Sequence, residues 1–123
     1  MQFIVLLISL FVAQPIAEYW LHRFAHFMRI EYHMSHHVYS SHGKYWGYKG
    51  DFTCRMLIVM LAVHGYHVAA LALLKYEVTH TAVHRVPGLR YLHRHHFLHH
   101  RKPNVNYSFS AIWPDRLFGT LEI

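Results

Sequence analysis

The chain has 123 residues, enough for a single domain, and its 12 Lys and Arg against 6 Asp and Glu give a net charge of +6. Charged residues make up only 15% of it and hydrophobic residues 54%, which excludes a disordered basic tail. The single cysteine, Cys54, excludes an internal disulfide, a cysteine-based zinc finger and an iron–sulfur cluster held by this chain alone. Imidazole is instead abundant, with 15 histidines in the chain.

The first apolar segment covers residues 1–17, which contain no charged side chain. A secretory signal also has such a segment, but no Lys or Arg precedes the apolar core here, so a segment retained in the membrane is favoured. A second uncharged segment, residues 56–74, would span about 28 Å as a helix, close to the roughly 30 Å of a bilayer core. The sequence therefore predicts an all-α integral membrane protein in which residues 1–123 form one domain.

All basic residues lie outside these two segments, and the positive-inside rule then places the polar stretches on the cytoplasmic side. Residues 85–102 interleave basic and aromatic side chains, as some nucleic-acid-binding surfaces do, but they carry no recognised nucleic-acid-binding motif. We therefore expect these charges to lie at the membrane surface, and we expect no nucleic-acid partner.

Histidines form two similar blocks, residues 18–37 and residues 77–100, and each block reads Glu, then HxxxH, then HxxHH. Residues three or four apart share a helix face at about 5–6 Å, so the rings of one motif can converge on an ion at about 2.0–2.1 Å. The ten imidazoles are too many for one metal ion and suit two, with iron, copper, nickel and zinc all compatible with this ligand type. They are His22, His26, His33, His36, His37, His80, His84, His96, His99 and His100.

Each motif also has a structural explanation, because a lone HxxxH in an apolar helix is more often a packed, hydrogen-bonded pair than a metal site. Four such motifs in this order favour the metal site. The remaining histidines are not predicted to be ligands. His42 is expected in an exposed loop, His93 and His95 at the surface or beside the last motif, and His64 and His67 within the second apolar segment.

The two blocks also place a carboxylate in the same position, because Glu18 lies four residues before His22 and Glu77 three residues before His80. On a helix each carboxylate can accept the second ring N–H of its histidine and fix the tautomer. This repeated placement favours that hydrogen bond. The alternative is a plain ion pair with a neighbouring basic side chain, Arg23 or Lys75.

The order of these motifs resembles the fatty acid hydroxylase / sterol desaturase superfamily of membrane di-iron enzymes, and carotenoid hydroxylases share the HxxHH style of the first block. Residues 74–80 and the tail segments 106–108 and 113–120 carry the resemblance further. Three positions depart from it: Glu77 stands where Asp is commoner, Ser108 replaces a usual Gly, and Pro114 is extra. The resemblance covers nearly the whole chain from Glu18 onward.

The resemblance implies that the ten histidines hold two iron ions, for which zinc can substitute, with no catalytic residue beyond this centre. The centre would use O2 to hydroxylate or desaturate a C–H bond of a lipid: a fatty acyl chain, a sterol or a carotenoid. Electrons would come from an external donor of the ferredoxin or cytochrome b5 type. The alternative is a non-catalytic histidine-rich membrane metal-binding protein or partner subunit, which leaves the motif order and the tail unexplained.

The two blocks can share a site only if both lie on one side of the membrane. The 19 residues of segment 56–74 cannot cross twice, which needs about 40 residues. We therefore expect a shallow re-entrant helical hairpin that breaks near residues 64–66, with residues 1–14 dipping to a similar depth before Pro15. The alternatives are a shortened relative of the family and a homo-oligomer that assembles its sites across a dimer.

Overall fold

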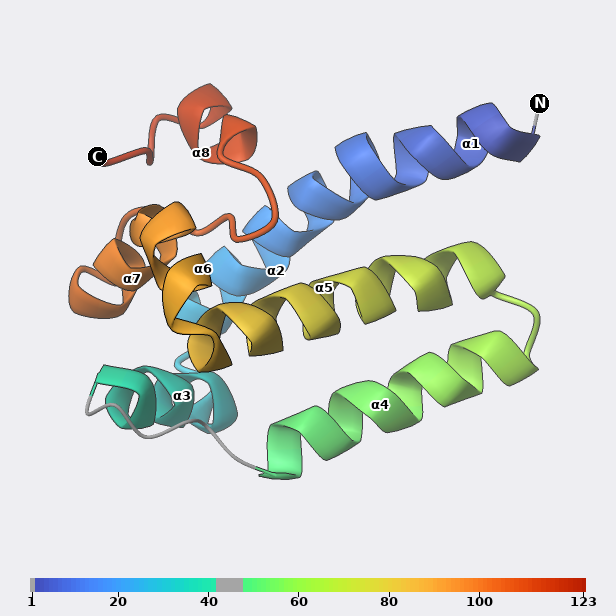
Figure 1. Ribbon diagram of the computed structural model, residues 1–123, viewed down its shortest axis with the longest axis horizontal. Coiled ribbons are helices and arrows are strands. Elements are labelled where there is room, and N and C mark those ends of the chain that lie inside the picture. Colours follow the sequence, from blue (N-terminus) through green and yellow to red (C-terminus); the bar gives the residue numbers. More distant parts are fainter. Residues whose placement is uncertain (1, 42–47) are drawn as a thin grey trace.

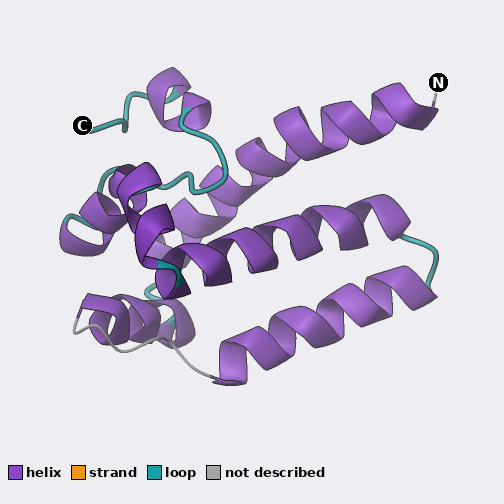
Figure 2. Cartoon of the chain, in the orientation of Figure 1, coloured by secondary structure: helices purple, strands orange, loops and turns teal. Residues whose placement is uncertain are grey.

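Helices make up all the regular structure in the described part of the chain, which comprises residues 2–41 and 48–123 of a computed structural model. Figure 2 shows these helices and the described loops that join them. The all-α prediction is confirmed. His42 lies outside the described residues, so its expected place in an exposed loop stays a prediction.

The chain begins with one long apolar helix, formed by α1 (Gln2–Ile8), the π-helical segment η1 (Ser9–Ala13) and α2 (Gln14–Phe27). These 26 residues rise about 39 Å, which exceeds the roughly 30 Å of a bilayer core. Most of the large apolar side chains on this helix are exposed. The helix is therefore long and apolar enough to cross a membrane, and it is not a buried core helix.

The expected end of the first helix before Pro15 was wrong, because the helix continues through this residue. The depth of residues 1–14 in a membrane stays a prediction. Proline has no N–H and normally interrupts the helical ladder. Immediately before it the ladder shifts to π register, in which the N–H of Gln14 donates to the carbonyl of Ser9. The next carbonyl in this register, that of Leu10, has no donor from Pro15, and Lys75 Nζ donates to it instead at 3.0 Å.

The second apolar segment forms a helical hairpin of α4 (Tyr48–Val63) and α5 (His67–Arg85), which lie antiparallel in Figure 1. The break occurs where it was expected. Gly65 takes a φ of +82°, which an L side chain rarely adopts, and the N–H of Tyr66 donates to the carbonyl of Leu61 at 2.8 Å. The two helices rise about 24 and 28 Å, so the hairpin is longer than one formed by residues 56–74 alone.

The hairpin brings both histidine blocks to one end of the molecule. Helix α3 (Glu31–Ser41) follows α2, and α6 (Pro87–Leu92) and α7 (Arg94–Arg101) follow α5. In Figure 1 the C-terminal end of α2, the C-terminal end of α5 and helices α3 and α7 gather at one end, while the N-terminus and the hairpin turn lie at the other. The hairpin therefore returns the chain to the end of the molecule at which the first block lies, and the two blocks meet there.

The small core lies at this same end and joins α2 to the C-terminal tail, residues 102–123, which includes α8 (Trp113–Leu117). Tyr19 on α2 is completely buried, and its ring stacks on that of Phe118 with centroids 4.7 Å apart. Phe109 of the tail is also buried, and its ring packs edge-on against those of His80 and His96. Aromatic packing thus fixes the tail beside the histidines.

Candidate metal centre

The four histidine motifs meet in space as two groups of ring nitrogens, each group with all its nitrogens within 4.8 Å of one another. The first group draws on α2, α3 and α7, and the second on α3, α5 and α7. Neither sequence block therefore forms a group by itself. The first group is His22, His26, His33, His37 and His99, and the second group is His36, His84, His96 and His100.

Each HxxHH motif supplies both groups through its adjacent histidines. His36 belongs to the second group and His37 to the first, and on α7 His99 belongs to the first and His100 to the second. Successive residues on an α-helix point about 100° apart, since one turn takes about 3.6 residues, so an HH pair can address two neighbouring sites. The rings of His37 and His100 lie 4.6 Å apart, which makes the two groups direct neighbours.

The spacing of the nitrogens suits a shared cation better than hydrogen bonds. His26 Nε2 lies 3.0 Å from His99 Nε2 and 2.9 Å from His33 Nε2, and the same spacing, 3.0 Å, separates the Nε2 atoms of His84 and His96. An imidazole nitrogen offers one hydrogen or one lone pair, so it satisfies two such neighbours poorly. Two ligands at right angles, each about 2.1 Å from a metal ion, lie about 3.0 Å apart.

One buried nitrogen supports the same interpretation. Nε2 of His22 belongs to the first group and has no hydrogen-bond partner among the described residues. Leaving a buried polar atom unsatisfied typically costs about 1–3 kcal/mol, a penalty that a coordinated ion would remove. Because every donor in both groups is an imidazole, the residues fit a transition metal such as iron, copper, nickel or zinc.

The imidazoles at the site are held in the neutral form that binds metal ions. Burial, reinforced by the neighbouring His26, lowers the pKa of His33 to about 4. Burial also lowers the pKa of His99 and of His100 to about 3, with nearby histidines adding to the effect. At neutral pH these rings carry no charge and offer a lone pair.

Nine of the ten predicted ligands belong to the two groups, and the tenth, His80, lies at the edge of the second. Its ring centroid is 4.9 Å from that of His36 and 4.7 Å from that of His84, but its nitrogens do not join the group. A ligand role for His80 stays a prediction. Of the histidines not predicted as ligands, His64 and His67 are exposed at the hairpin turn, and His93 and His95 belong to neither group.

The carboxylate of Glu18 does not bond to His22 as predicted. It accepts hydrogen bonds from the backbone N–H groups of Phe109 and Ser110 and from the side-chain amide of Gln14. Helical spacing places the two side chains on one face but does not decide which donors the carboxylate meets. Glu18 therefore anchors the tail to α2.

The carboxylate of Glu77 likewise does not bond to His80. Its Oε1 accepts hydrogen bonds from Nε and Nη2 of Arg55, each at 3.0 Å, and this ion pair joins α4 to α5. The alternative, an ion pair between Glu77 and Lys75, was also wrong, because the Lys75 ammonium donates to the backbone of the first helix and to Gln14 Oε1. Glu77 therefore stabilises the hairpin.

Backbone carbonyls of the tail contact two histidines of the first group, and at His22 a carbonyl takes the place predicted for a carboxylate. Nδ1 of His22 lies within hydrogen-bond distance of the carbonyl oxygen of Tyr107, and Nδ1 of His99 lies 2.6 Å from that of Val105. A hydrogen on Nδ1 leaves the Nε2 lone pair directed at the group. No signal in the sequence identifies this role, because every residue has a carbonyl.

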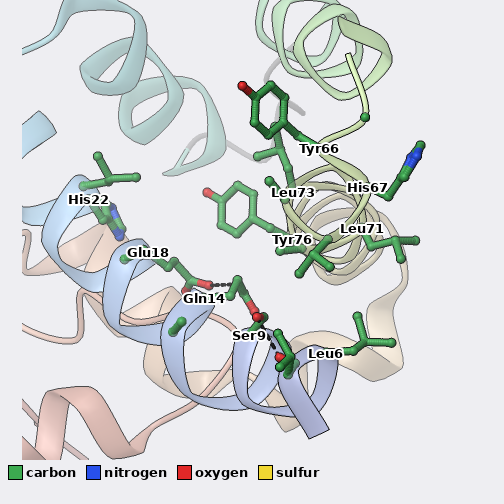
Figure 3. Close-up of a pocket in the computed structure, with 18 of the residues that line it drawn as sticks. Leu6, Ser9, Gln14, Glu18, His22, Tyr66, His67, Leu71, Leu73 and Tyr76 are labelled. Atoms are coloured by element: carbon green, nitrogen blue, oxygen red, sulfur yellow. Dashed lines mark hydrogen bonds between the residues drawn. The ribbon is translucent and has the colours of Figure 1, made fainter. Parts of the chain in front are cut away.

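A long apolar cavity of about 1370 Å³ lies between the first helix and α5 and ends at the first histidine group. It extends from Phe3 and His67, near the hairpin turn, to His22 and His33. Figure 3 shows Tyr76 of α5 on the opposite side of this cavity from the first helix. Ligand pockets commonly measure about 300–1,000 Å³, so the cavity is large enough for an extended ligand. None of its lining residues belongs to the second group.

Together these features define a helical protein with a membrane-length apolar helix, two adjacent histidine groups and an apolar cavity that leads to one of them. The family model described as "Fatty acid hydroxylase" matches residues 7–120, and the chain belongs to this family within the fatty acid hydroxylase / sterol desaturase superfamily. Neither a search of curated proteins nor one of solved structures gave a significant match.

Proposed function

We propose that the protein is a membrane di-iron oxygenase that hydroxylates or desaturates a C–H bond of a lipid, using O2 and two external electrons. One observation carries the proposal: a long apolar cavity ends at a group of five imidazoles, two of which, His22 and His33, line it. A protein that only stored metal ions would need the imidazoles but not the cavity.

The shape and lining of the cavity favour a lipid. Along the first helix, the rise from Phe3 to His22 is about 28 Å, comparable with the thickness of a bilayer core. The walls between these ends are mainly apolar, with Leu6 and Ala17 on the first helix and Leu71 and Leu73 on α5. A fatty acyl chain, a sterol or a carotenoid would lie in this space and displace water from the histidines.

Two bound iron ions would supply the activation of O2, with the two histidine groups as their ligands. Hydroxylation consumes one C–H bond, O2, two electrons and two protons, and it yields an alcohol and one water. Desaturation removes two hydrogens from adjacent carbons with the same inputs and yields two waters. The chain contributes neutral nitrogen donors, holds the lipid against His22 and His33, and excludes water.

The two electrons would come from an acidic carrier of the ferredoxin or cytochrome b5 type. Arg94 and Arg101 of α7 are exposed, as is the adjacent Lys102, and the same helix carries His96 and His99. A carrier attracted to these charges would dock one helix away from the ions. The positive-inside rule places this surface on the cytoplasmic side. Both groups assemble within one chain, so the site does not require a second copy.

The test is lipid mass spectrometry on a host that expresses the full chain with iron, a reductase and a carrier protein, grown under ¹⁸O2. We expect a lipid that gains one ¹⁸O atom or loses two hydrogens, and that is missing from the empty host and from the variant His99→Ala. Protein that binds iron but leaves the lipid profile unchanged would contradict the oxygenase and support the metal-binding alternative.

A further inference from the structure

The two histidine groups differ in what holds their rings. In the first group, the Nδ1 atoms of His22 and His99 contact tail carbonyls, as described above. The buried Nδ1 atom of His37 in the first group has no hydrogen-bond partner among the described residues, and the same holds for the Nδ1 atoms of His96 and His100 in the second. The tail therefore orients rings of the first group and leaves these two rings of the second without such support.

The orienting segment of the tail is itself held by two carboxylates, which bind four successive backbone N–H groups. The N–H groups of Tyr107 and Ser108 donate to the two carboxylate oxygens of Asp115 at 2.7 and 2.8 Å. Those of the next two residues donate to Glu18. Asp115 is completely buried, and it also accepts a hydrogen bond from the hydroxyl of Thr120 at 2.8 Å.

These bonds act on the same peptides that face the histidines. Asp115 accepts a hydrogen bond from the N–H of Ser108, and the same peptide group carries the carbonyl that contacts His22, which is the carbonyl of Tyr107. Asn106, which precedes it, takes an unusual φ of +55° and is fixed by its own side chain: its amide donates to the carbonyl of His95 at 3.1 Å. Asp115 holds this peptide group and Asn106 is fixed before it, so the carbonyl of Tyr107 cannot rotate away from the imidazole of His22. Asp115 therefore sets the position of that carbonyl.

We infer that Asp115 is a positioning residue for the first histidine group, the one that the cavity reaches, and that it acts through the carbonyl of Tyr107 on His22. The inference rests on the proposed function in one respect, that each group holds one metal ion. It predicts that the two sites respond differently to changes in the tail, although α7 contributes histidines to both.

The test is a titration of the full, detergent-solubilised chain with Co²⁺, followed by its visible absorption, which resolves two binding steps if two sites are present. Asp115→Asn keeps the shape but turns one acceptor into an NH2 group that faces a backbone N–H. We expect one of the two steps to weaken by about 10–100-fold while the other keeps its wild-type affinity. His22→Ala, which should abolish the affected step, and His96→Ala, which should abolish the other, assign each step to its group.

Two further variants separate positioning from general loosening of the tail. Lys102→Gln removes the surface ion pair of the tail with Glu122 and should leave both steps unchanged. Thr120→Val removes the hydroxyl bond to Asp115 together with the longer contact to the hydroxyl of Tyr19, and it leaves both backbone bonds of Asp115 in place. It should therefore weaken the same step to a smaller extent, and it serves if Asp115→Asn does not fold. Equal weakening of both steps, or of neither, would overturn the inference. A wild-type chain with fewer than two steps would instead contradict the proposed function.

Discussion

The ammonium nitrogen of Lys75 lies 3.0 Å from the carbonyl oxygen of Leu10, in a helix that Pro15 would otherwise interrupt. The same ammonium donates to Gln14 Oε1 at 2.8 Å. These two bonds tie α5 to the π-helical part of the first helix. They also satisfy a carbonyl in a segment apolar enough to lie in lipid, where an unsatisfied backbone group is costly.

Lys75→Met should therefore destabilise the fold without emptying the metal sites. It keeps the length of the side chain but leaves two acceptors without this donor, and we expect the free energy of unfolding to fall by about 1–3 kcal/mol. Thermal unfolding in detergent measures the effect. Lys102→Met, which removes an exposed ion pair with Glu122, should change it by only about 0–1 kcal/mol. An unchanged melting temperature for Lys75→Met would contradict this role.

His99→Ala should abolish lipid oxidation, whereas His64→Ala should not. His99 is completely buried in the first group, and His64 is exposed at the hairpin turn. Loss of one ligand opens a coordination position and changes the geometry around the ion. Product is quantified by lipid mass spectrometry at matched protein levels. Equal activity of the two variants would show that the first group is not the reaction centre.

Glu77→Gln should behave like Arg55→Gln in stability and like wild type in metal affinity. The two residues form one ion pair between α4 and α5, and neither contacts a histidine group through that pair. Because the Arg55 side chain is 59% exposed, we expect a loss of about 1 kcal/mol from either change and little further loss from the double change. A selective loss of metal by Glu77→Gln would restore the predicted role beside His80.

Acid should destabilise the metal-free protein. The pKa values of His99 and His100 are lowered to about 3 and that of His33 to about 4, whereas an imidazole of the unfolded chain titrates near its ordinary value of about 6.5. Between pH 6.5 and pH 3 the unfolded chain therefore binds more protons than the folded one. The contribution of these rings to the free energy of unfolding is fully present above about pH 6.5 and is lost as the pH falls toward 3.

The melting temperature of metal-free protein, measured from pH 7 to pH 4, checks this sign. The melting temperature should fall as the pH is lowered. The fall should be smaller in His99→Ala, which lacks one of the responsible groups, and equal to that of the wild type in His64→Ala. A melting temperature that is constant or rises on acidification would show that these rings are not held neutral by burial.

The sequence predicted those features that depend on spacing along a helix. Nine of the ten predicted histidines meet in two groups, and three pairs spaced i, i+4 each share a group: His22 with His26, His33 with His37, and His96 with His100. The adjacent histidines of each HxxHH motif instead join different groups. Gly65 marked the hairpin break because few other residues adopt a φ of +82° without strain. The tail was singled out by its resemblance to the family, although its role was not.

Other features depend on partners distant in the chain, which spacing does not reveal. Pro15 was expected to end a helix, but Lys75 from another helix supplies the missing donor. Glu18 and Glu77 have the correct spacing for histidine, yet backbone N–H groups and Arg55 bind them instead. Which histidine of each HH pair joins which group also follows only from the packing of α3 against α7.

The number of iron ions bound per chain tests the central claim most directly. Full-length protein, loaded with iron under anaerobic conditions and freed of excess metal, is analysed for iron and for protein in the same sample. Two neighbouring histidine groups predict two ions per chain, falling to one in a variant such as His96→Ala that disables a single group. One ion or none in the wild-type chain would contradict the two-metal site.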